Sequence, residues 1–137
     1  MKPAVASSLA LVLLLTLSLT AQEKETLHTK DTLDTVKENV KAGKAVIVDV
    51  REDSEWKDGH LAGAIHVPQS KLTVEAEVAE LVKRLPKDKV LYTHCRAGRR
   101  ALACGEILKK QGFDVRPLKP GFEELIKAGF QKAEDKP

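Results

Sequence analysis

Apolar residues recur along the chain in two patterns, one typical of buried strands and one typical of amphipathic helices. The segments KAVIVDV (44–50) and DKVLYTH (88–94) are nearly continuous apolar runs, which indicates strands buried on both faces. Apolar residues three and four positions apart predict helices over 31–42, 74–85 and 101–111. Because strand and helix patterns alternate, the chain is expected to adopt an α/β fold built from βαβ units.

Shorter segments complete the predicted sheet and its covering helices. A helical turn and a Gly-rich loop are expected within 52–63, and GFEELIKAG (121–129) is expected to form a closing helix. Further short strands are predicted near Leu27 and His28, at 64–67 and at 113–118. The prediction is therefore a central parallel β-sheet of about five strands with helices on both faces.

The segment 1–21 has the layout of a secretory signal peptide. A basic residue near its start is followed by an apolar run from Leu9 to Leu19 and by small residues near Ala21. The run of roughly 11 residues is shorter than the roughly 20 that span a bilayer, although a membrane anchor is the alternative. We expect cleavage after about Ala21, a single mature domain over 22–137, and a periplasmic or secreted protein without membrane attachment.

The charge of the chain is small and its signs are interspersed. The formal net charge is +3, and loss of Lys2 with the signal lowers the basic residues from 23 to 22 against 20 acidic ones. This balance does not indicate a nucleic-acid partner. The 4 histidines are scattered without ligand spacing, so no metal site is expected.

Two cysteines in an exported protein suggest a disulfide, but their spacing argues against one. If a helix begins near Arg99, Cys104 lies inside it and Cys95 lies before it, which places their Cα atoms beyond the roughly 7 Å limit for a bridge. We favour two free thiols. Cys104 shares a helical face with Ala101 and Leu108, so it is expected to be a small buried residue rather than a resolving thiol.

The loop CRAGRR (95–100) holds the chemistry that the sequence predicts. Ligands of open α/β sheets bind beyond the carboxyl ends of the strands, where Cys95 lies. Gly98 allows a tight turn, so that backbone N–H groups and the start of the next helix can face an anion. Such surroundings stabilise a thiolate, although Cys95 could instead be a structural buried residue beside solvent-facing arginines.

Together with VIVDVREDSEWKDGHLAGAIHVP (46–68), this loop resembles the rhodanese family of sulfurtransferases in its single-domain form. The resemblance covers roughly residues 27 to 130. It implies that Cys95 takes the outer sulfur of a thiosulfate-like donor as a persulfide and passes it to cyanide, a small thiol or a protein thiol, without a cofactor. It also implies that a cradle of backbone N–H groups binds the substrate, with positive potential from the arginine side chains; the cradle residues are Arg96, Ala97, Gly98, Arg99 and Arg100.

Two interpretations of Arg51 are open. It ends a strand beside the presumed site, so it either lines the substrate pocket or forms an ion pair with Glu55 that braces the loop. Trp56 is expected to pack in the core, with a pocket wall as the alternative. PGFEEL (120–125) departs from the Gly-Gly-Trp ending common in the family, which affects packing of the last helix more than chemistry.

The histidines are expected to be structural. His60 and His66 lie in the Gly-rich connection, and the family prefers asparagine at the position of His66. His94 precedes Cys95 and could act as a base, but alternation along a strand directs its side chain away from the thiol.

Two other function classes compete with sulfur transfer. A cysteine-based phosphatase or arsenate reductase uses an oxyanion loop with five residues between Cys and Arg, whereas Cys95 and Arg100 enclose four, and no aspartate is clearly placed as a general acid. A persulfide carrier or a binding module of the same fold is the second alternative. Turnover of free thiosulfate without a partner would separate these classes.

Overall fold

The structure, a computed structural model, describes residue 3 and residues 26–134. The predicted signal peptide and its cleavage site near Ala21 therefore fall outside the described residues, apart from Pro3. Within the described part, no helix combines the length and the apolar character needed to cross a membrane.

Three parallel strands form the sheet in the order β2-β1-β3. They are β1 (Ala45–Asp49), β2 (Ile65–His66) and β3 (Val90–His94). The β-branched run of β1 occupies the centre, with Asp49 opposite His66 on one side and opposite His94 on the other. Because all three strands are parallel, their carboxyl ends meet at one edge, and the segments that begin at Val50, Val67 and Cys95 all leave from that edge.

The prediction of about five strands was wrong, because two segments run beside the sheet without becoming strands. The 113–118 segment pairs with β3 through a single bridge, between Leu91 and Val115. Three backbone hydrogen bonds join this segment to β3, with the N–H groups of Leu91, Arg116 and Leu118 as donors, but they do not extend it into a regular strand. The segment predicted as an edge strand at residues 27–28 makes one backbone hydrogen bond nearby, from Thr29 N–H to the Pro117 carbonyl at 2.7 Å.

The helices follow the predicted pattern with small shifts at their ends and one addition. Thr32 caps the first helix by accepting a hydrogen bond from the Thr35 N–H, as Ser and Thr commonly do at this position. The short α3, which the sequence analysis did not predict, begins directly after Pro68. The helices are α1 (Leu33–Lys41), α2 (Asp53–Asp58), α3 (Gln69–Leu72), α4 (Glu75–Val82), α5 (Arg99–Lys110) and α6 (Phe122–Lys127).

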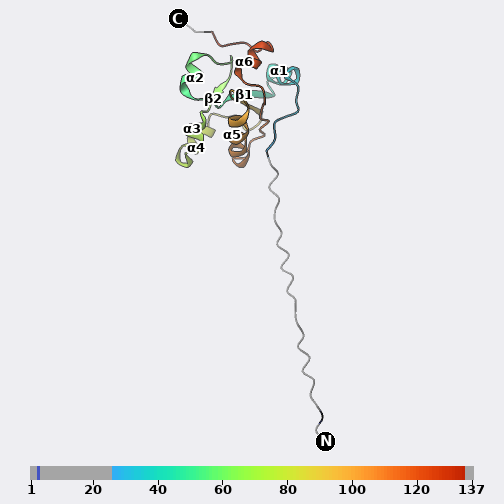
Figure 1. Cartoon of the computed structure of the whole chain (residues 1–137), viewed down its shortest axis with the longest axis vertical. Coiled ribbons are helices and arrows are strands. Elements are labelled where there is room, and N and C mark those ends of the chain that lie inside the picture. The colour runs from blue at the N-terminus through green and yellow to red at the C-terminus, as the bar shows by residue number, and fades with distance from the viewer. Residues whose placement is uncertain (1–2, 4–25, 135–137) are drawn as a thin grey trace.

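Helices cover both faces of the sheet, as predicted, and each face has its own hydrophobic cluster (Figure 1). Val48 and Leu91 point to the face covered by α3, α4 and α5, whereas Ile47 and Tyr92 point to the face covered by α1 and α6. Cys95 continues the first of these two faces, and it lies in the same cluster as Cys104 of α5.

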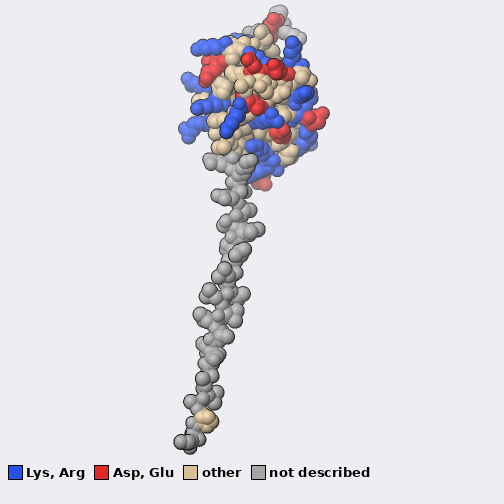
Figure 2. All heavy atoms as spheres, turned by 90° about the vertical axis from the view of Figure 1, so that its right-hand side faces the viewer, with Lys and Arg blue, Asp and Glu red and all other residues tan. Residues whose placement is uncertain are grey.

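The surface carries both signs of charge. Figure 2 shows lysines and arginines interspersed with acidic side chains over the face that it draws. This distribution agrees with the small net charge of the sequence.

Candidate active site

Cys95 is the first residue after β3, in a loop that leads directly into α5. Gly98 adopts a left-handed conformation with φ of 90°, which turns the chain so that α5 begins at Arg99. The Gly98 N–H donates a hydrogen bond to the Cys95 Sγ over 3.1 Å. The side chain of Cys95 is 1% exposed, so its sulfur faces this donor and the first turn of a 12-residue helix rather than bulk water.

Neighbouring segments fix the loop from outside. A Cβ on Gly98 would lie 2.8 Å from His28 Nε2 and 2.9 Å from the Lys119 carbonyl oxygen, so the loop packs tightly at this point. His28 Nε2 donates to the Gly98 carbonyl at 2.9 Å. On the other side, the Phe122 N–H donates to the Cys95 carbonyl at 3.0 Å. The conformation around the thiol is therefore held by both ends of the described chain.

The arginines of the loop have different surroundings. Arg96 and Arg99 are exposed, as is Ala97 between Arg96 and Gly98. Arg100 is turned away to α2, where its guanidinium binds both carboxylate oxygens of Glu55 at 2.6 and 3.0 Å. That hydrogen-bonded pairing lowers the pKa of Glu55 to about 2. Arg100 thus anchors the start of α5 to α2.

Arg51 follows β1 at the same edge of the sheet, where it is 5% exposed. Its guanidinium forms an ion pair with Asp49 at 2.7 Å, donates to the Gly59 carbonyl at 2.7 Å and lies 4.3 Å above the Phe122 ring. The alternative of an ion pair between Arg51 and Glu55 was wrong, because each of the two has a different partner.

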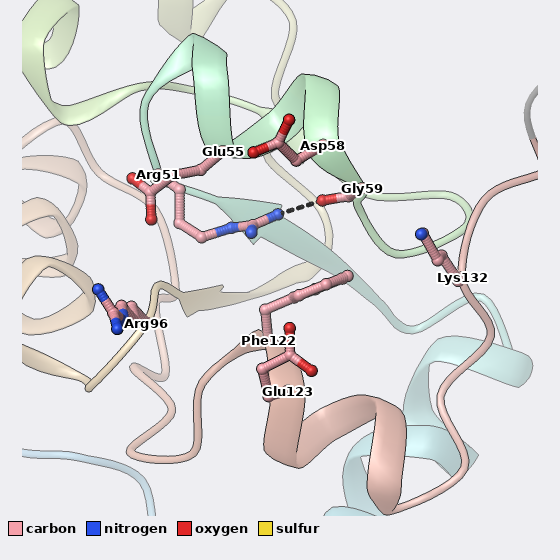
Figure 3. A pocket seen from close by; sticks show the side chains of 8 residues that line it. All are labelled: Arg51, Glu55, Asp58, Gly59, Arg96, Phe122, Glu123 and Lys132. Carbon is pink, nitrogen blue, oxygen red and sulfur yellow. Dashed lines mark hydrogen bonds between the residues drawn. The ribbon is translucent and has the colours of Figure 1, made fainter.

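A cavity of about 410 Å³ opens beside the Cys95 loop (Figure 3). Arg51 and Arg96 both line it, so the structure brings together two of the predicted substrate-binding side chains. Among the described residues that form its wall, neither Cys95 nor Arg100 is included. The remaining lining residues are Glu55, Asp58, Gly59, Phe122, Glu123 and Lys132.

Cys104 lies on α5 in fully buried surroundings, and both cysteines are free thiols. The two-free-thiol prediction is thus confirmed. Burial, followed by the nearby Cys95, raises the pKa of the Cys104 thiol to about 12. A thiol with such a pKa is protonated at neutral pH and has little nucleophilic character.

His94 is buried on the opposite face of the sheet from the thiol. Its Nε2 atom has no hydrogen-bond partner within the described part of the chain and lies 3.6 Å from an oxygen of Asp49. Burial lowers the pKa of His94 below its ordinary value of 6.5. The alternation argument for His94 was therefore correct, and the ring is not placed to take a proton from Cys95.

Trp56 does not pack in the core, contrary to the sequence-based expectation. It is half-buried and stacks with two imidazole rings, that of His60 at 3.6 Å and that of His66 at 4.5 Å between centroids. His60 also contacts the Trp56 carbonyl at 3.0 Å, and His66 contacts that of Arg51 at 2.8 Å. Both histidines are structural in this sense, because they hold the Gly-rich connection against α2.

The residues that sequence reasoning missed come mainly from the end of the chain. Phe122 and Glu123 begin α6, and Lys132 follows it, yet all three line the cavity formed by residues some 70 positions earlier. Gly121 makes this approach possible, because a Cβ there would overlap the Arg96 carbonyl oxygen. The Pro-Gly pair at 120–121 indicates in the sequence that the backbone could be closely approached there, but it does not indicate which residue makes the contact.

Several known proteins are similar to this chain in sequence. The family model of the rhodanese-like domain matches residues 32–128. The Bacillus subtilis protein YrkF is 31% identical over 94 residues, which cover 67% of this chain and 48% of YrkF, so the chain spans about half the length of that relative. The thiosulfate sulfurtransferase GlpE of Coxiella burnetii is 33% identical over 87 residues, covering 63% of this chain and 76% of GlpE.

A similar fold is found among solved structures. The crystal structure of a rhodanese-related protein from Thermoplasma volcanium superposes with a TM-score of 0.61 at 27% sequence identity. The match covers 75% of this chain and 95% of that one. Nearly the whole of that solved chain is therefore matched by this one.

Proposed function

The chain belongs to the rhodanese-like domain family, and from this premise we propose that it is a sulfurtransferase that works through a persulfide on Cys95. The donor is thiosulfate or a similar sulfane compound, and the acceptor is cyanide or a thiol. The observation that carries the proposal is the hydrogen bond from the Gly98 N–H to the Cys95 Sγ at the start of α5, because a backbone donor and a helix N-terminus both favour a thiolate there.

In the first step, the Cys95 thiolate attacks the outer sulfur of thiosulfate. A new S–S bond forms, the S–S bond of thiosulfate breaks, and sulfite leaves with the electron pair. The loop N–H groups stabilise the anionic sulfur before and after transfer. Arg96, exposed at the cavity beside the loop, supplies positive charge for the dianionic donor.

In the second step, the acceptor attacks the outer sulfur of the persulfide. With cyanide, a C–S bond forms and the persulfide S–S bond breaks. Thiocyanate leaves, and the electron pair of the broken S–S bond stays on the Cys95 Sγ as a thiolate. No proton has to move in either step. A general base is therefore unnecessary, which agrees with the placement of His94 on the other face of the sheet.

The test is thiocyanate release from thiosulfate and cyanide by the purified protein without any partner. We expect turnover by wild type and by Cys104→Ala, and a loss of roughly a thousandfold or more in Cys95→Ser. Equal turnover in Cys95→Ser would contradict the proposal. Absence of turnover, with persulfide still formed on Cys95, would instead favour a carrier that needs a docked acceptor.

A cysteine-based phosphatase is the other enzyme class to test, because Asp58 lies in the wall of the cavity. We expect no hydrolysis of aryl phosphates, since the Arg100 guanidinium is bound to Glu55 rather than free over the loop. If the protein hydrolyses aryl phosphates in a way that depends on both Cys95 and Asp58, and does not use thiosulfate, it is a phosphatase and the sulfurtransferase proposal is wrong.

Export to the periplasm or out of the cell is also part of the proposal. It is supported by the charge and hydropathy pattern of residues 1–21. N-terminal sequencing of the protein from the periplasmic or secreted fraction should find a start near Gln22. Recovery of the intact Met1 form in membranes would contradict it.

A further inference from the structure

Gly98 connects the sulfur of Cys95 to a histidine from the beginning of the described segment 26–134. The Gly98 N–H donates to the Cys95 Sγ over 3.1 Å. The Gly98 carbonyl oxygen accepts from the Leu102 N–H at 3.2 Å, within α5, and from His28 Nε2 at 2.9 Å. Through this one glycine, a side chain 70 positions earlier in the chain reaches the group that faces the sulfur.

The start of α5 depends on an outside partner, because the residue at its N-cap is a glycine. Ser, Thr, Asp or Asn at this position would fix the first turn through a side-chain hydrogen bond, and Gly98 makes none. Glycine also adopts positive and negative φ about equally, so the φ of 90° is not set by the residue itself. The direction of the Gly98 N–H therefore depends on what surrounds the loop.

His28 restricts Gly98 by packing as well as by its hydrogen bond. A Cβ added to Gly98 would lie 2.8 Å from His28 Nε2 and 2.9 Å from the Lys119 carbonyl oxygen. The ring and this carbonyl thus close the same side of the glycine, and Gly98 cannot shift toward them without displacing one of the two. A carbonyl oxygen only accepts hydrogen bonds, so the ring carries a proton on Nε2.

The histidine is itself held in place by the residues that follow it. The Thr29 N–H donates to the Pro117 carbonyl at 2.7 Å. A carboxylate oxygen of Asp31 accepts a hydrogen bond from the Tyr92 hydroxyl at 2.6 Å, and Tyr92 is fully buried in β3, the strand that leads to the loop. His28 therefore extends from a segment that is fixed to the same strand as the thiol.

We propose that His28 is a positioning residue for the Cys95 nucleophile: by holding Gly98 it keeps the Gly98 N–H directed at the sulfur. His28 moves no proton and acts only through Gly98. A donor that is fixed in advance stabilises an anionic sulfur without having to reorient during the reaction. Loss of the histidine should therefore slow every reaction of the Cys95 thiolate, and its importance for sulfur transfer rests on the function proposed above.

The test compares two substitutions of His28 that differ in whether they can donate. Glutamine places an amide N–H group near the position of Nε2, whereas leucine has no donor. His28→Leu should slow alkylation of Cys95 by iodoacetamide at neutral pH about fivefold, and should slow sulfur loading from thiosulfate by a similar factor. Both rates in His28→Gln should stay within about twofold of wild type.

Thr32→Ala is the matched control for a general loss of stability. The Thr32 side chain caps α1 through the Thr35 N–H, so its removal should lower the melting temperature without changing the contacts of Gly98. Alkylation of Cys95 should stay at the wild-type rate in this variant. Hydrogen exchange of the Gly98 N–H then locates the effect, because it should be faster in His28→Leu than in the control, in His28→Gln or in wild type.

Three results would overturn the positioning role: equal alkylation of Cys95 in wild type and His28→Leu, slowing that His28→Gln shares, or slowing that Thr32→Ala shares. If His28→Leu does not fold, His28→Asn replaces it, because its amide is one carbon shorter and should not reach the Gly98 carbonyl. Alkylation and hydrogen exchange need no sulfur donor. If thiosulfate loads no sulfur while alkylation follows the expected order, the proposed function fails and the positioning role stands.

Discussion

Cys95 and Cys104 belong to the same hydrophobic cluster and are both almost fully buried, yet their sulfurs face different surroundings. The Cys95 Sγ accepts a hydrogen bond from the Gly98 N–H at a helix start, whereas apolar packing around Cys104 raises the pKa of its thiol to about 12. Exposure therefore does not distinguish the thiol that we propose to be reactive from the one that we expect to be inert. The polar groups directed at the sulfur do.

The largest expected difference between the two thiols is in alkylation. Iodoacetamide at neutral pH should label Cys95, and Cys104 should react at least roughly a hundredfold more slowly, because almost none of it is thiolate. Peptide mapping after timed quenching measures both rates in one sample. Unfolding in urea should make the two rates equal. Equal labelling of both cysteines in the native protein would contradict the proposed difference in their reactivity.

A pair of glycine variants tests whether the geometry of the Cys95 loop distinguishes it from the surroundings of Cys104 on α5. Gly98→Ala forces an alanine into a conformation with φ of 90° and against the Lys119 carbonyl, so we expect a loss of about 2 kcal/mol in the free energy of unfolding. Sulfur transfer should fall by roughly tenfold or more, because the Gly98 N–H would move away from Cys95.

The matched variant is Gly105→Ala, beside Cys104. Its Cβ would lie 2.8 Å from the Pro117 ring, which must shift, whereas alanine favours the helix, so we expect a net loss of about 1 to 2 kcal/mol in the free energy of unfolding. Turnover should remain near that of wild type. Thermal unfolding and thiocyanate release measure both effects, and equal losses of activity in the two variants would show that the loop has no special role.

The ion pair between Arg100 and Glu55 should have a smaller effect. Arg100→Ala should lower turnover by roughly tenfold through a looser start of α5, and stability by about 1 kcal/mol, since the pair is only partly buried. Glu55→Gln is the control, because it removes the charge of the partner and keeps its shape. A loss of turnover in Arg100→Ala that Glu55→Gln does not share would place Arg100 at the substrate instead.

The same pair predicts an acid dependence. The pKa of Glu55 is about 2 in the folded protein against 4.5 for the free group, so the pair stabilises the fold fully above pH 4.5. This contribution is lost as the pH falls from 4.5 toward 2. Urea unfolding across that range should show a smaller loss in Glu55→Gln than in wild type, because other carboxylates such as Asp31 also have a lowered pKa.

The smallest expected effect belongs to His94, which is as buried as the thiols but lies on the other face of the sheet. Burial lowers its pKa, so the neutral ring is the stable form and its contribution is complete above pH 6.5. Stability should decline as the pH falls below 6.5 and through the lowered pKa of His94, because protonation favours the unfolded chain. In urea unfolding, His94→Gln should reduce the decline of stability with falling pH. An unchanged decline would show that protonation of His94 does not cause it.

The sequence predicted the central strands well because their apolar runs are local and long. It overestimated the number of strands, since whether a short segment such as 113–118 forms a regular ladder depends on the neighbouring strand, which the local sequence does not contain. The unpredicted α3 is a single turn after Pro68, with too few residues to show a period.

In the candidate site, too, the local parts could be predicted from the sequence and the parts set by tertiary packing could not. The Cys95 loop is a continuous motif, so its place at a strand end follows from the sequence. The partners of Arg51 and Arg100 could not be assigned, because each arginine could reach more than one carboxylate and only the register of the strands and the position of α2 decide between them. Lys132 and Phe122 joined the cavity through tertiary packing alone.

The measurement that tests the central claim most directly is the intact mass of the protein after incubation with thiosulfate. Wild type and Cys104→Ala should each gain one sulfur atom, and cyanide should remove it with release of thiocyanate. Cys95→Ser should gain none. Two results would contradict the assignment of the sulfur carrier to Cys95. One is a sulfur atom gained by Cys95→Ser, and the other is no gain by Cys104→Ala while wild type gains one.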